Sequence, residues 1–332
     1  MDICVVGKQN ASLAMQLATR LNAPLYTFSH DYFADTESIM QFSHGVQVTD
    51  KLVLISYQFL PTNREAGGDR YTCVNHQFLD ILFLVQRLKQ YKPAGIALVL
   101  PYLPYSRQEK KDDCCLTSPF ELALSLLAHV GVQSIIASDV HGEVGNAQGI
   151  YEVCLTSQWI QFLQEYCNKQ NISPDRISIL SPDQGGISRA RAVAKALGAD
   201  IAFMYKQRPE INHVVMQGLV GDLVNKTVIV IDDILDTART AVLACEIARD
   251  YGADRVIGCF SHAVLSAGSL KRLEDSCFDA VFLSNTMTID TAHLPSMVHI
   301  VSMESYLVEQ VEGIIHQMMH KETSCKLSLI NQ

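Results

Sequence analysis

A short apolar run in the second half of the chain ends in a group of carboxylates. Residues 228–231 are β-favouring and apolar, as in a buried strand. Asp232 and Asp233 follow directly, and Asp236 comes three positions after Asp233. Ligands of open parallel sheets bind beyond the carboxyl ends of the strands, and carboxylates bind sugar hydroxyls and divalent cations. The pattern therefore predicts a site for a polyol, a metal ion or both.

The residues after these carboxylates can bind an anion. The predicted start of a helix consists of Asp236, Thr237, Ala238, Arg239 and Thr240. The first amide groups of a helix have no partner within it, and the helix dipole attracts negative charge there. The two threonine hydroxyls add further donors. We expect a sugar phosphate at this turn, although an acidic turn with a plain helix cap would use the same residue types.

Three further segments carry polar side chains near predicted strands. Asp183 is followed closely by two glycines, which permit a close approach of the backbone to a ligand. His141 lies in a turn after another predicted strand. Arg107 can bind phosphate oxygens in bidentate fashion, and Gln108 can recognise the edge of an adenine. These segments are candidates for a nucleotide site.

The composition excludes several classes of protein. The chain has 332 residues and a formal net charge of −9, whereas non-specific nucleic-acid binding requires dense positive charge. The ten cysteines include no Cys-x-x-Cys pair and no zinc-type spacing, which indicates a reducing compartment. We find no signal peptide and no apolar run of the ~20 residues that a membrane span requires. We therefore expect a cytoplasmic protein without nucleic-acid or membrane partners.

Apolar runs alternate with segments of helical period, which is the pattern of a parallel α/β fold. The predicted strands are residues 3–6, 52–56, 95–100, 134–138, 177–180, 201–204, 227–231, 255–259, 280–284 and 299–302. The predicted helices are residues 11–21, 75–90, 119–130, 157–169, 186–197, 240–251, 265–275 and 305–321. Residues 131–136 recur in type as residues 252–257, which predicts two similar halves. We expect one domain over 1–153 and a second over 154–332.

These segments together resemble the ribose-phosphate pyrophosphokinases, or phosphoribosyl pyrophosphate synthetases. Residues 228–240 are similar to the phosphoribosyl-diphosphate motif that this family shares with the type I phosphoribosyltransferases. Residues 181–186 resemble the Ser-Pro-Asp-x-Gly-Gly segment of the pyrophosphokinases. Residues 101–111 resemble their Pro-Tyr-x-x-Tyr-x-Arg-Gln-Asp-Lys/Arg-Lys stretch, which the transferases lack. The resemblance runs from about residue 3 to residue 310.

The resemblance implies a fold and a reaction. Each half would have the type I phosphoribosyltransferase-like fold, a mainly parallel sheet flanked by helices, and the second half would carry the ribose-phosphate motif. The enzyme would transfer the β,γ-diphosphate of ATP to the 1-hydroxyl of ribose 5-phosphate, which gives phosphoribosyl pyrophosphate and AMP. It would require Mg²⁺. It would assemble as a homo-oligomer, either a dimer or a hexamer built from dimers.

The resemblance also implies roles for single residues. A basic loop motif would supply the catalytic residues Lys206 and Arg208. The ATP-binding residues would be Phe33, Asp35, Glu37, Arg107, Gln108, Asp112 and His141. The ribose-phosphate site would contain Asp232, Asp233, Asp236, Thr237, Ala238, Arg239 and Thr240. The Mg²⁺ ligands would be His141 and Asp183.

Two departures from the family pattern leave alternatives open. Ala238 and Arg239 replace a small residue followed by Gly or Lys, and His76 and Gln77 replace an Asp-Asn pair. One alternative is a non-catalytic regulatory paralogue that assembles with an active synthetase. The other is a phosphoribosyltransferase that acts on a base, which would leave Arg107 and its neighbour without a role.

Overall fold

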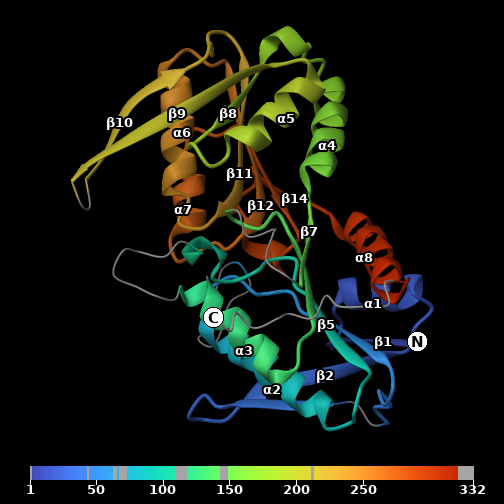
Figure 1. Cartoon of the computed structure of the whole chain (residues 1–332). Coiled ribbons are helices and arrows are strands. Elements are labelled where there is room, and N and C mark those ends of the chain that lie inside the picture. The colour runs from blue at the N-terminus through green and yellow to red at the C-terminus, as the bar shows by residue number, and fades with distance from the viewer. Residues whose placement is uncertain are drawn as a thin grey trace. The chain divides into compact units, whose positions relative to one another are not determined.

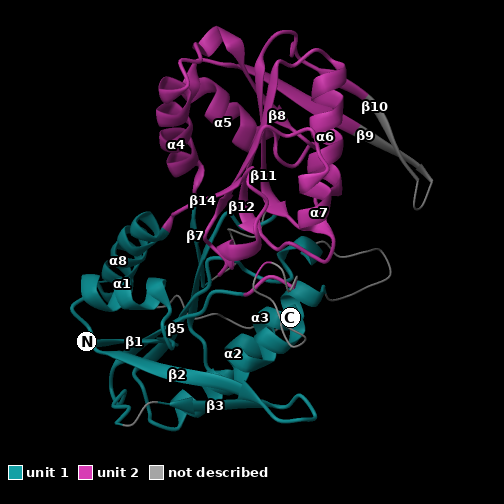
Figure 2. Ribbon diagram, turned by 180° about the vertical axis from the view of Figure 1, so that it is seen from behind, with its two compact units in different colours: residues 1–59, 70–153, 304–332 teal, residues 60–69, 154–303 magenta. Residues whose placement is uncertain are grey.

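The computed structural model describes residues 2–42, 45–62, 66, 73–109, 118–142, 149–210 and 213–320, with the backbone alone for 206–210 and 213–217. The chain forms two compact units (Figure 2). The first unit comprises Met1–Phe59, Arg70–Val153 and Glu304–Gln332. The second comprises Leu60–Asp69 and Cys154–Met303. Each unit contains one seven-stranded sheet, so the predicted α/β class with two similar halves is confirmed.

The C-terminal helix packs with the first unit. In helix α8 (Glu304–His320), Glu304 Oε2 accepts a hydrogen bond of 2.8 Å from Ser12 Oγ on helix α1 (Ser12–Arg20). Further along the same pair of helices, Arg20 Nη2 lies 2.8 Å from Glu312 Oε2. We expected residues 154–332 to form one domain. The structure instead assigns α8 to the first unit, because its hydrogen-bond and ion-pair partners lie on α1.

The first sheet has the strand order β3-β2-β1-β4-β5-β6-β7, and β2 and β3 are its one antiparallel pair among the described residues. Helices α1 and α8 cover one face, and α2 and α3 cover the other (Figure 1). The strands are β1 (Ile3–Lys8), β2 (Leu25–Tyr32), β3 (Ser38–Phe42), β4 (Leu52–Ser56), β5 (Gly95–Val99), β6 (Ser134–Ser138) and β7 (Ile150–Val153). The two helices not yet bounded are α2 (Val74–Lys89) and α3 (Pro119–Val130).

The second sheet repeats this topology in the order β10-β9-β8-β11-β12-β13-β14. Helices α4 and α5 lie on one face, and α6 and α7 lie on the other (Figures 1 and 2). The strands are β8 (Ile177–Ser181), β9 (Asp200–Glu210), β10 (His213–Val220), β11 (Thr227–Leu235), β12 (Arg255–Ala263), β13 (Ala280–Ser284) and β14 (Val298–Val301). The helices are α4 (Thr156–Lys169), α5 (Ile187–Leu197), α6 (Arg239–Asp250) and α7 (Ser269–Glu274).

Helix α3 shows why several element ends were predictable. Ser118 Oγ accepts a hydrogen bond from the Glu121 amide at 3.1 Å, and the Glu121 carboxylate accepts one from the Ser118 amide. Pro119 occupies the first turn, and Gly131 ends the helix with φ 113°. A capping box, an N-terminal proline and a C-terminal glycine are all local signals. The prediction of a helix over 119–130 is confirmed.

Other predictions required correction. Helix α7 begins at Ser269, not at Leu265, because Leu265 has φ 47° and Gly268 has φ 79°, and neither angle continues a right-handed helix. Strands β2, β3, β7 and β10 were not predicted. All four lie at or next to the edges of their sheets, where one face or one side is exposed and the continuous apolar pattern of a central strand is lost.

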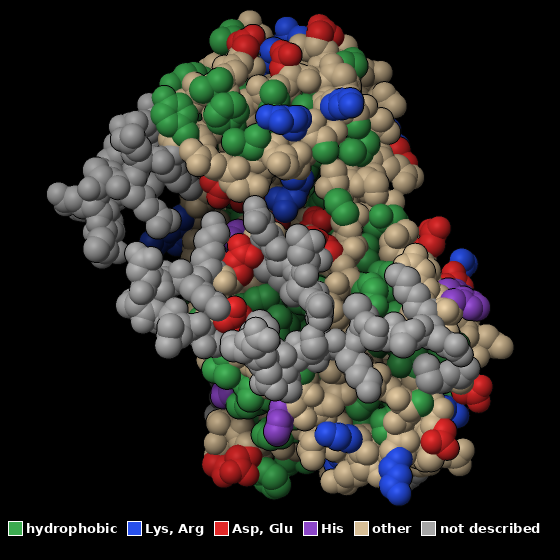
Figure 3. All heavy atoms as spheres, in the orientation of Figure 1, with side chains coloured by type: hydrophobic (Ala, Val, Ile, Leu, Met, Phe, Trp, Pro, Cys, Tyr) green, Lys and Arg blue, Asp and Glu red, His purple; other side chains and the backbone are tan. Residues whose placement is uncertain are grey.

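Charged residues are scattered over the face of the molecule in Figure 3, where single lysine and arginine side chains lie among acidic ones. No helix in the described part of the chain is long and apolar enough to cross a membrane.

Candidate functional site

The second sheet has a switch point between its neighbouring strands β8 and β11. The helices that follow these strands, α5 and α6, lie on opposite faces of the sheet (Figure 1). Such a point opens a crevice beyond the strand ends where ligands bind. Asp183 comes two residues after the end of β8, and Asp232 and Asp233 lie beyond the last β11 residue that pairs with β8. The topology therefore brings three predicted carboxylates to one end of two adjacent strands.

The turn after β8 holds Asp183 close to this pair. Ser181 Oγ donates to the Asp183 carbonyl at 2.7 Å, and the Gly186 amide donates to Asp183 Oδ1 at 3.1 Å. A Cβ atom added at Gly186 would lie 2.7 Å from Ser181 Oγ, 3.8 Å from Asp232 Oδ1 and 3.9 Å from Asp183 Oδ1. A side chain at this position would therefore press on the Ser181 hydroxyl and lie in contact with both carboxylates.

The electrostatics of this carboxylate group favour a bound cation or hydroxyl donors. Burial raises the pKa of Asp232 well above its ordinary value, and the neighbouring carboxylates of Asp233 and Asp183 raise it further. Arg189 opposes this effect and lowers the same pKa. Its Nη1 lies 3.7 Å from an oxygen of each carboxylate of the Asp232–Asp233 pair, too far for a hydrogen bond. Three carboxylates thus share one nearby guanidinium.

Arg189 received no role in the sequence analysis, although it lies three residues after the segment 181–186. Its Nη1 atom is buried and has no hydrogen-bond partner among the described residues. A buried guanidinium nitrogen without a partner is costly, so its place beside two carboxylates beyond the strand ends points to a functional role. The available signal was a basic residue in the first turn of the helix that follows an acidic strand end.

We expect Arg189→Met to impair sugar-phosphate use. Loss of one charge-assisted contact of about 2 kcal/mol should lower kcat/KM for ribose 5-phosphate about 30-fold. Because Arg189 lowers the pKa of Asp232, the acid limb of the pH–rate profile should move to higher pH. Steady-state kinetics from pH 5 to 9 measure both effects, with Arg191→Met, an exposed site on the same helix, as the matched control. An unmoved acid limb would contradict this role.

The start of α6 has the form expected of a phosphate-binding turn. Its N-cap residue Ala238 has φ 62° and carries no side-chain group that could cap the helix. An Arg272 nitrogen donates to the Thr237 carbonyl, and Ser266 Oγ donates to Asp236 Oδ1, so the turn is held from outside. Arg239 is exposed, and its amide makes a long contact of 3.5 Å with Thr237 Oγ1. The amides of the first turn are thereby left for an anion.

The first unit contains several of the residues predicted to bind ATP. Arg107 and Gln108 are exposed in a 3₁₀ turn after β5, and His141 lies in the turn after the neighbouring strand β6. A Cβ atom added at Gly142 would lie 2.0 Å from Glu109 Oε1, so the Glu109 carboxylate lies against the backbone beside His141. The structure therefore brings the two turns together, and Glu109 links them.

Gly142→Ala is expected to separate these two turns. The glycine has φ 84°, which an L side chain rarely adopts, and the new methyl group would overlap the Glu109 carboxylate. We expect a rise of about tenfold in KM for ATP, since strain of this kind costs about 1–2 kcal/mol. Gly313→Ala is the control, because a Cβ there would have nothing within 4 Å. An unchanged KM for ATP would contradict the role of these turns.

The loop 33–37 joins β2 and β3 at the edge of the first sheet. The Phe33 amide donates to the Glu37 carbonyl at 2.9 Å, and the Glu37 amide donates to Asp35 Oδ1 at 3.2 Å. Phe33 is 56% exposed, which leaves its ring available to a partner. Thr36 has φ 78°, so it adopts the left-handed conformation that a glycine would favour.

The remaining predicted residues are less fully described. The β9–β10 hairpin contains Lys206 and Arg208 in β9, and its register pairs Met216 with Lys206. The side chains of both basic residues lie outside the described part, and so does Asp112 altogether. Sequence analysis expected a strand over 201–204 only, whereas β9 continues to Glu210.

Metal ligands were also predicted. His141 belongs to the first unit and Asp183 to the second. Among the described residues no group of three or more His, Cys, Asp or Glu side chains has a metal-binding arrangement. The carboxylates of Asp183, Asp232 and Asp233 are oxygen donors of the kind that Mg²⁺ prefers.

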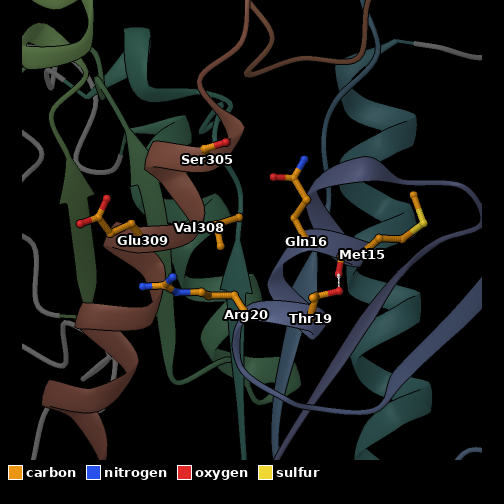
Figure 4. A pocket seen from close by; sticks show the side chains of 7 residues that line it. All are labelled: Met15, Gln16, Thr19, Arg20, Ser305, Val308 and Glu309. Carbon is orange, nitrogen blue, oxygen red and sulfur yellow. Dashed lines mark hydrogen bonds between the residues drawn. The ribbon is translucent and has the colours of Figure 1, made fainter.

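An open groove of about 530 Å³ lies between α1 and α8 of the first unit (Figure 4). It is lined by Met15, Gln16, Thr19, Arg20, Ser305, Val308 and Glu309. None of the predicted site residues lines it.

Comparisons with known proteins show the family and the fold. Residues 3–131 match the family model described as the N-terminal domain of ribose phosphate pyrophosphokinase. Residues 181–326 match the one described as the phosphoribosyl synthetase-associated domain. The solved structure of phosphoribosylpyrophosphate synthetase from Mycobacterium smegmatis matches with a TM-score of 0.77 and 24% identity, covering 96% of this chain and 100% of that chain. This likeness shows the fold.

Two curated relatives extend the match to the sequence. The ribose-phosphate pyrophosphokinase of Thermotoga maritima is 30% identical over 310 residues, which cover 93% of each chain. That of Thermosipho africanus is 30% identical over 308 residues, which cover 92% of each chain. Identity at this level over nearly the full length of both relatives shows that the chain belongs to the ribose-phosphate pyrophosphokinase family.

Proposed function

We propose that this chain transfers the β,γ-diphosphate of ATP to the 1-hydroxyl of ribose 5-phosphate, with release of AMP. The observation that carries the proposal is the carboxylate group beside the start of α6 at the β8–β11 switch point. A carboxylate pair cannot bind a phosphate, but it can accept hydrogen bonds from sugar hydroxyls. An adjacent helix start can bind the phosphate of the same sugar. Family membership over the whole chain supports the same reaction.

Binding of ribose 5-phosphate would use the residues of this turn in two ways. Asp232 and Asp233 would accept hydrogen bonds from the ring hydroxyls and so orient the sugar. The turn from Asp236 through Thr237, Ala238 and Arg239 to Thr240 would hold the 5-phosphate with its amides and hydroxyls. Arg189 would keep the carboxylate pair ionised by lowering the pKa of Asp232.

The chemical step is a displacement at phosphorus. The anomeric oxygen would attack the β-phosphorus, lose its proton, and displace AMP as the bond from the β-phosphorus to the bridging oxygen breaks. Such a reaction requires mainly in-line positioning and stabilisation of charge. Lys206 and Arg208 would neutralise the charge that develops on the bridging oxygen. Closure of the β9–β10 hairpin over the site would also exclude water.

Magnesium fits the donors that are present. Burial and then the neighbouring carboxylates raise the pKa of Asp232, and a divalent ion beside them would lower it. We propose His141 and Asp183 as residues that hold Mg²⁺. When bound, the ion would neutralise charge on the triphosphate.

The ATP side of the reaction would use the first unit. Arg107 would bind phosphate oxygens, and Gln108 would recognise the adenine edge. Phe33 would stack on the base, while Asp35 and Glu37 would accept from its exocyclic amine. Asp112 and His141 complete the proposed set.

The assay for this function separates it from its alternatives. Purified protein with Mg²⁺, ATP and ribose 5-phosphate should release AMP in equal amount to phosphoribosyl pyrophosphate, as measured by ion-exchange chromatography. Release of ADP would indicate an ordinary kinase. Consumption of phosphoribosyl pyrophosphate with a base would indicate a phosphoribosyltransferase. An assembled protein that shows no turnover would indicate the regulatory paralogue.

Self-association is part of the proposal, and an exposed apolar face supports it. Leu79 and Phe83 lie one turn apart on α2, and Leu122 and Leu126 lie one turn apart on α3, which packs against α2. Their exposed fractions are 45%, 53%, 55% and 40%. Adjacent exposed apolar side chains of this size are typical of an interface, and a second copy of the chain would cover them.

Phe83→Glu is expected to reduce the mass of the assembly. A buried, unpaired carboxylate at an interface costs several kcal/mol, enough to separate copies at micromolar concentration. Size-exclusion chromatography with light scattering measures the mass. Val224→Glu, at another exposed apolar side chain, should leave it unchanged. Equal masses for all three proteins would place the interface elsewhere.

We also infer a cytoplasmic location. Cys4, Cys167 and Cys259 are free thiols buried in the structure. Free buried thiols are typical of proteins from a reducing compartment.

A further inference from the structure

Helix α2 contains a buried carboxylate that the proposed reaction does not use. Asp80 is 1% exposed, whereas the other inward residues of this helix are mostly apolar, such as Ile81, Leu84 and Val85. An isolated buried carboxylate is costly, so a folded protein retains one only where other groups satisfy it. The partners of Asp80 therefore indicate what the carboxylate does.

These partners come from both strands of the edge hairpin. Ser38 Oγ, on the first residue of β3, donates to Asp80 Oδ1. His30 Nε2, on β2, lies 3.2 Å from Asp80 Oδ2 in a buried contact, and neither of these two atoms has a hydrogen-bond partner among the described residues. Asp80 also lies close enough to Tyr57 to add to the effect of burial, which raises the pKa of that phenol. One carboxylate thus joins α2 to both strands.

His30 and Ser38 flank the loop 33–37. In the register of the hairpin Tyr32 pairs with Ser38, so the loop begins and ends one residue away from this pair. Every residue of the loop is exposed, from Phe33 to Glu37. Since the loop itself is not packed into the core, the base of the hairpin determines where its side chains lie.

Strand β2 pairs with β1 only from Leu25 to Phe28, so the part of the hairpin nearer the loop is attached to the body of the unit by fewer described contacts. Strand β3 is the outermost strand and pairs with β2 alone. Arg87 of α2 donates to the Met40 carbonyl at 2.8 Å, and its guanidinium lies 5.4 Å from the centre of the Phe42 ring. These contacts hold the far end of β3, whereas Asp80 holds the end that adjoins the loop.

We propose that Asp80 is a positioning residue, which fixes the loop 33–37 so that Phe33, Asp35 and Glu37 can engage ATP. This inference rests on the proposed function of these three residues. Without the carboxylate, Ser38 and His30 lose their common partner, and the loop samples more conformations. ATP then has to select the competent one, so its affinity falls while the chemical step at saturation is unaffected.

The test uses Asp80→Leu, which keeps the volume of the side chain, and Ser38→Ala, which removes the link from the hairpin side. Both variants should raise KM for ATP about tenfold, the size of one charge-assisted hydrogen bond, with kcat and KM for ribose 5-phosphate unchanged. Amide hydrogen exchange of residues 33–37 should become faster. Val85→Ala is the matched control, because it removes buried volume from the same helix without touching the hairpin link.

The outcomes are distinct. Unchanged exchange in the loop would overturn the proposal, and so would an equal change in Val85→Ala. Faster exchange with an unchanged KM for ATP would overturn the link between loop position and ATP binding. A wild-type protein that releases no AMP would refute the proposed function, while the exchange rates would still decide whether Asp80 holds the loop.

Discussion

Asp232→Asn is expected to lower ribose 5-phosphate turnover about 100-fold and to raise the thermal stability of the protein. Both effects have the same origin, because an ionised and a neutral side chain differ by several kcal/mol in such a site. The carboxylate is proposed to orient the sugar, and an amide accepts weaker hydrogen bonds and carries no charge. In the folded protein, however, the charge of Asp232 is opposed by burial and by the carboxylates of Asp233 and Asp183. The substitution should therefore lower the turnover of the enzyme and raise the stability of the protein.

The stability effect should depend on pH in a known sense. The pKa of Asp232 is raised in the folded protein, so the folded state binds its proton more tightly than the unfolded state does. Stability contributed by this proton is present at low pH and is lost as the pH rises through the raised pKa. The gain in melting temperature from Asp232→Asn should thus be present at pH 8 and absent at pH 4.

Thermal unfolding and steady-state kinetics of the same preparations measure both effects. Asp254→Asn is the control, since Asp254 forms an exposed pair with Arg176 at 2.8 Å and should change neither quantity appreciably. Lower stability of Asp232→Asn at pH 8 would show that the carboxylate is a structural partner, not a strained ligand group. Unchanged turnover would remove Asp232 from the substrate site.

Lys206→Ala is expected to lower kcat by about 10²–10³, the usual cost of removing one group that stabilises charge in a transition state. Lys206 lies in the part of β9 that continues past the last residue paired with β8 and pairs only with β10 among the described strands. A hairpin that extends beyond its sheet can move over a site without disturbing the core. KM for both substrates should change much less than kcat.

Single-turnover kinetics would separate the chemical step from product release in this variant. Lys271→Ala is the matched control, because Lys271 is exposed and pairs only with acidic residues of its own helix turn and C-cap among its described contacts. Lys206→Arg should retain part of the rate, since it keeps the positive charge. If the alanine variant turned over as fast as the wild type, Lys206 would have no part in the mechanism.

The central strands were predictable because a run of adjacent apolar residues marks each of them in the sequence. Residues 134–138 and 280–284 coincide with β6 and β13, and all five residues of each strand are buried. A strand covered on both faces has to be apolar throughout, and that pattern is local. Strands β2, β3, β7 and β10 lie at or next to a sheet edge and have mixed patterns, because they are less completely covered than the central strands.

The sequence by itself determined the two-halved α/β fold, the acidic strand end before residue 236 and the helix start that follows it. These features depend on apolar periodicity and on neighbours within a few positions. Only the tertiary structure decided that Arg189 lies between two carboxylates, that Glu109 lies against Gly142, and that Asp80 joins both strands of a hairpin. Such contacts link residues that are far apart along the chain or lie on different elements. Packing and electrostatics select them after the local elements have formed.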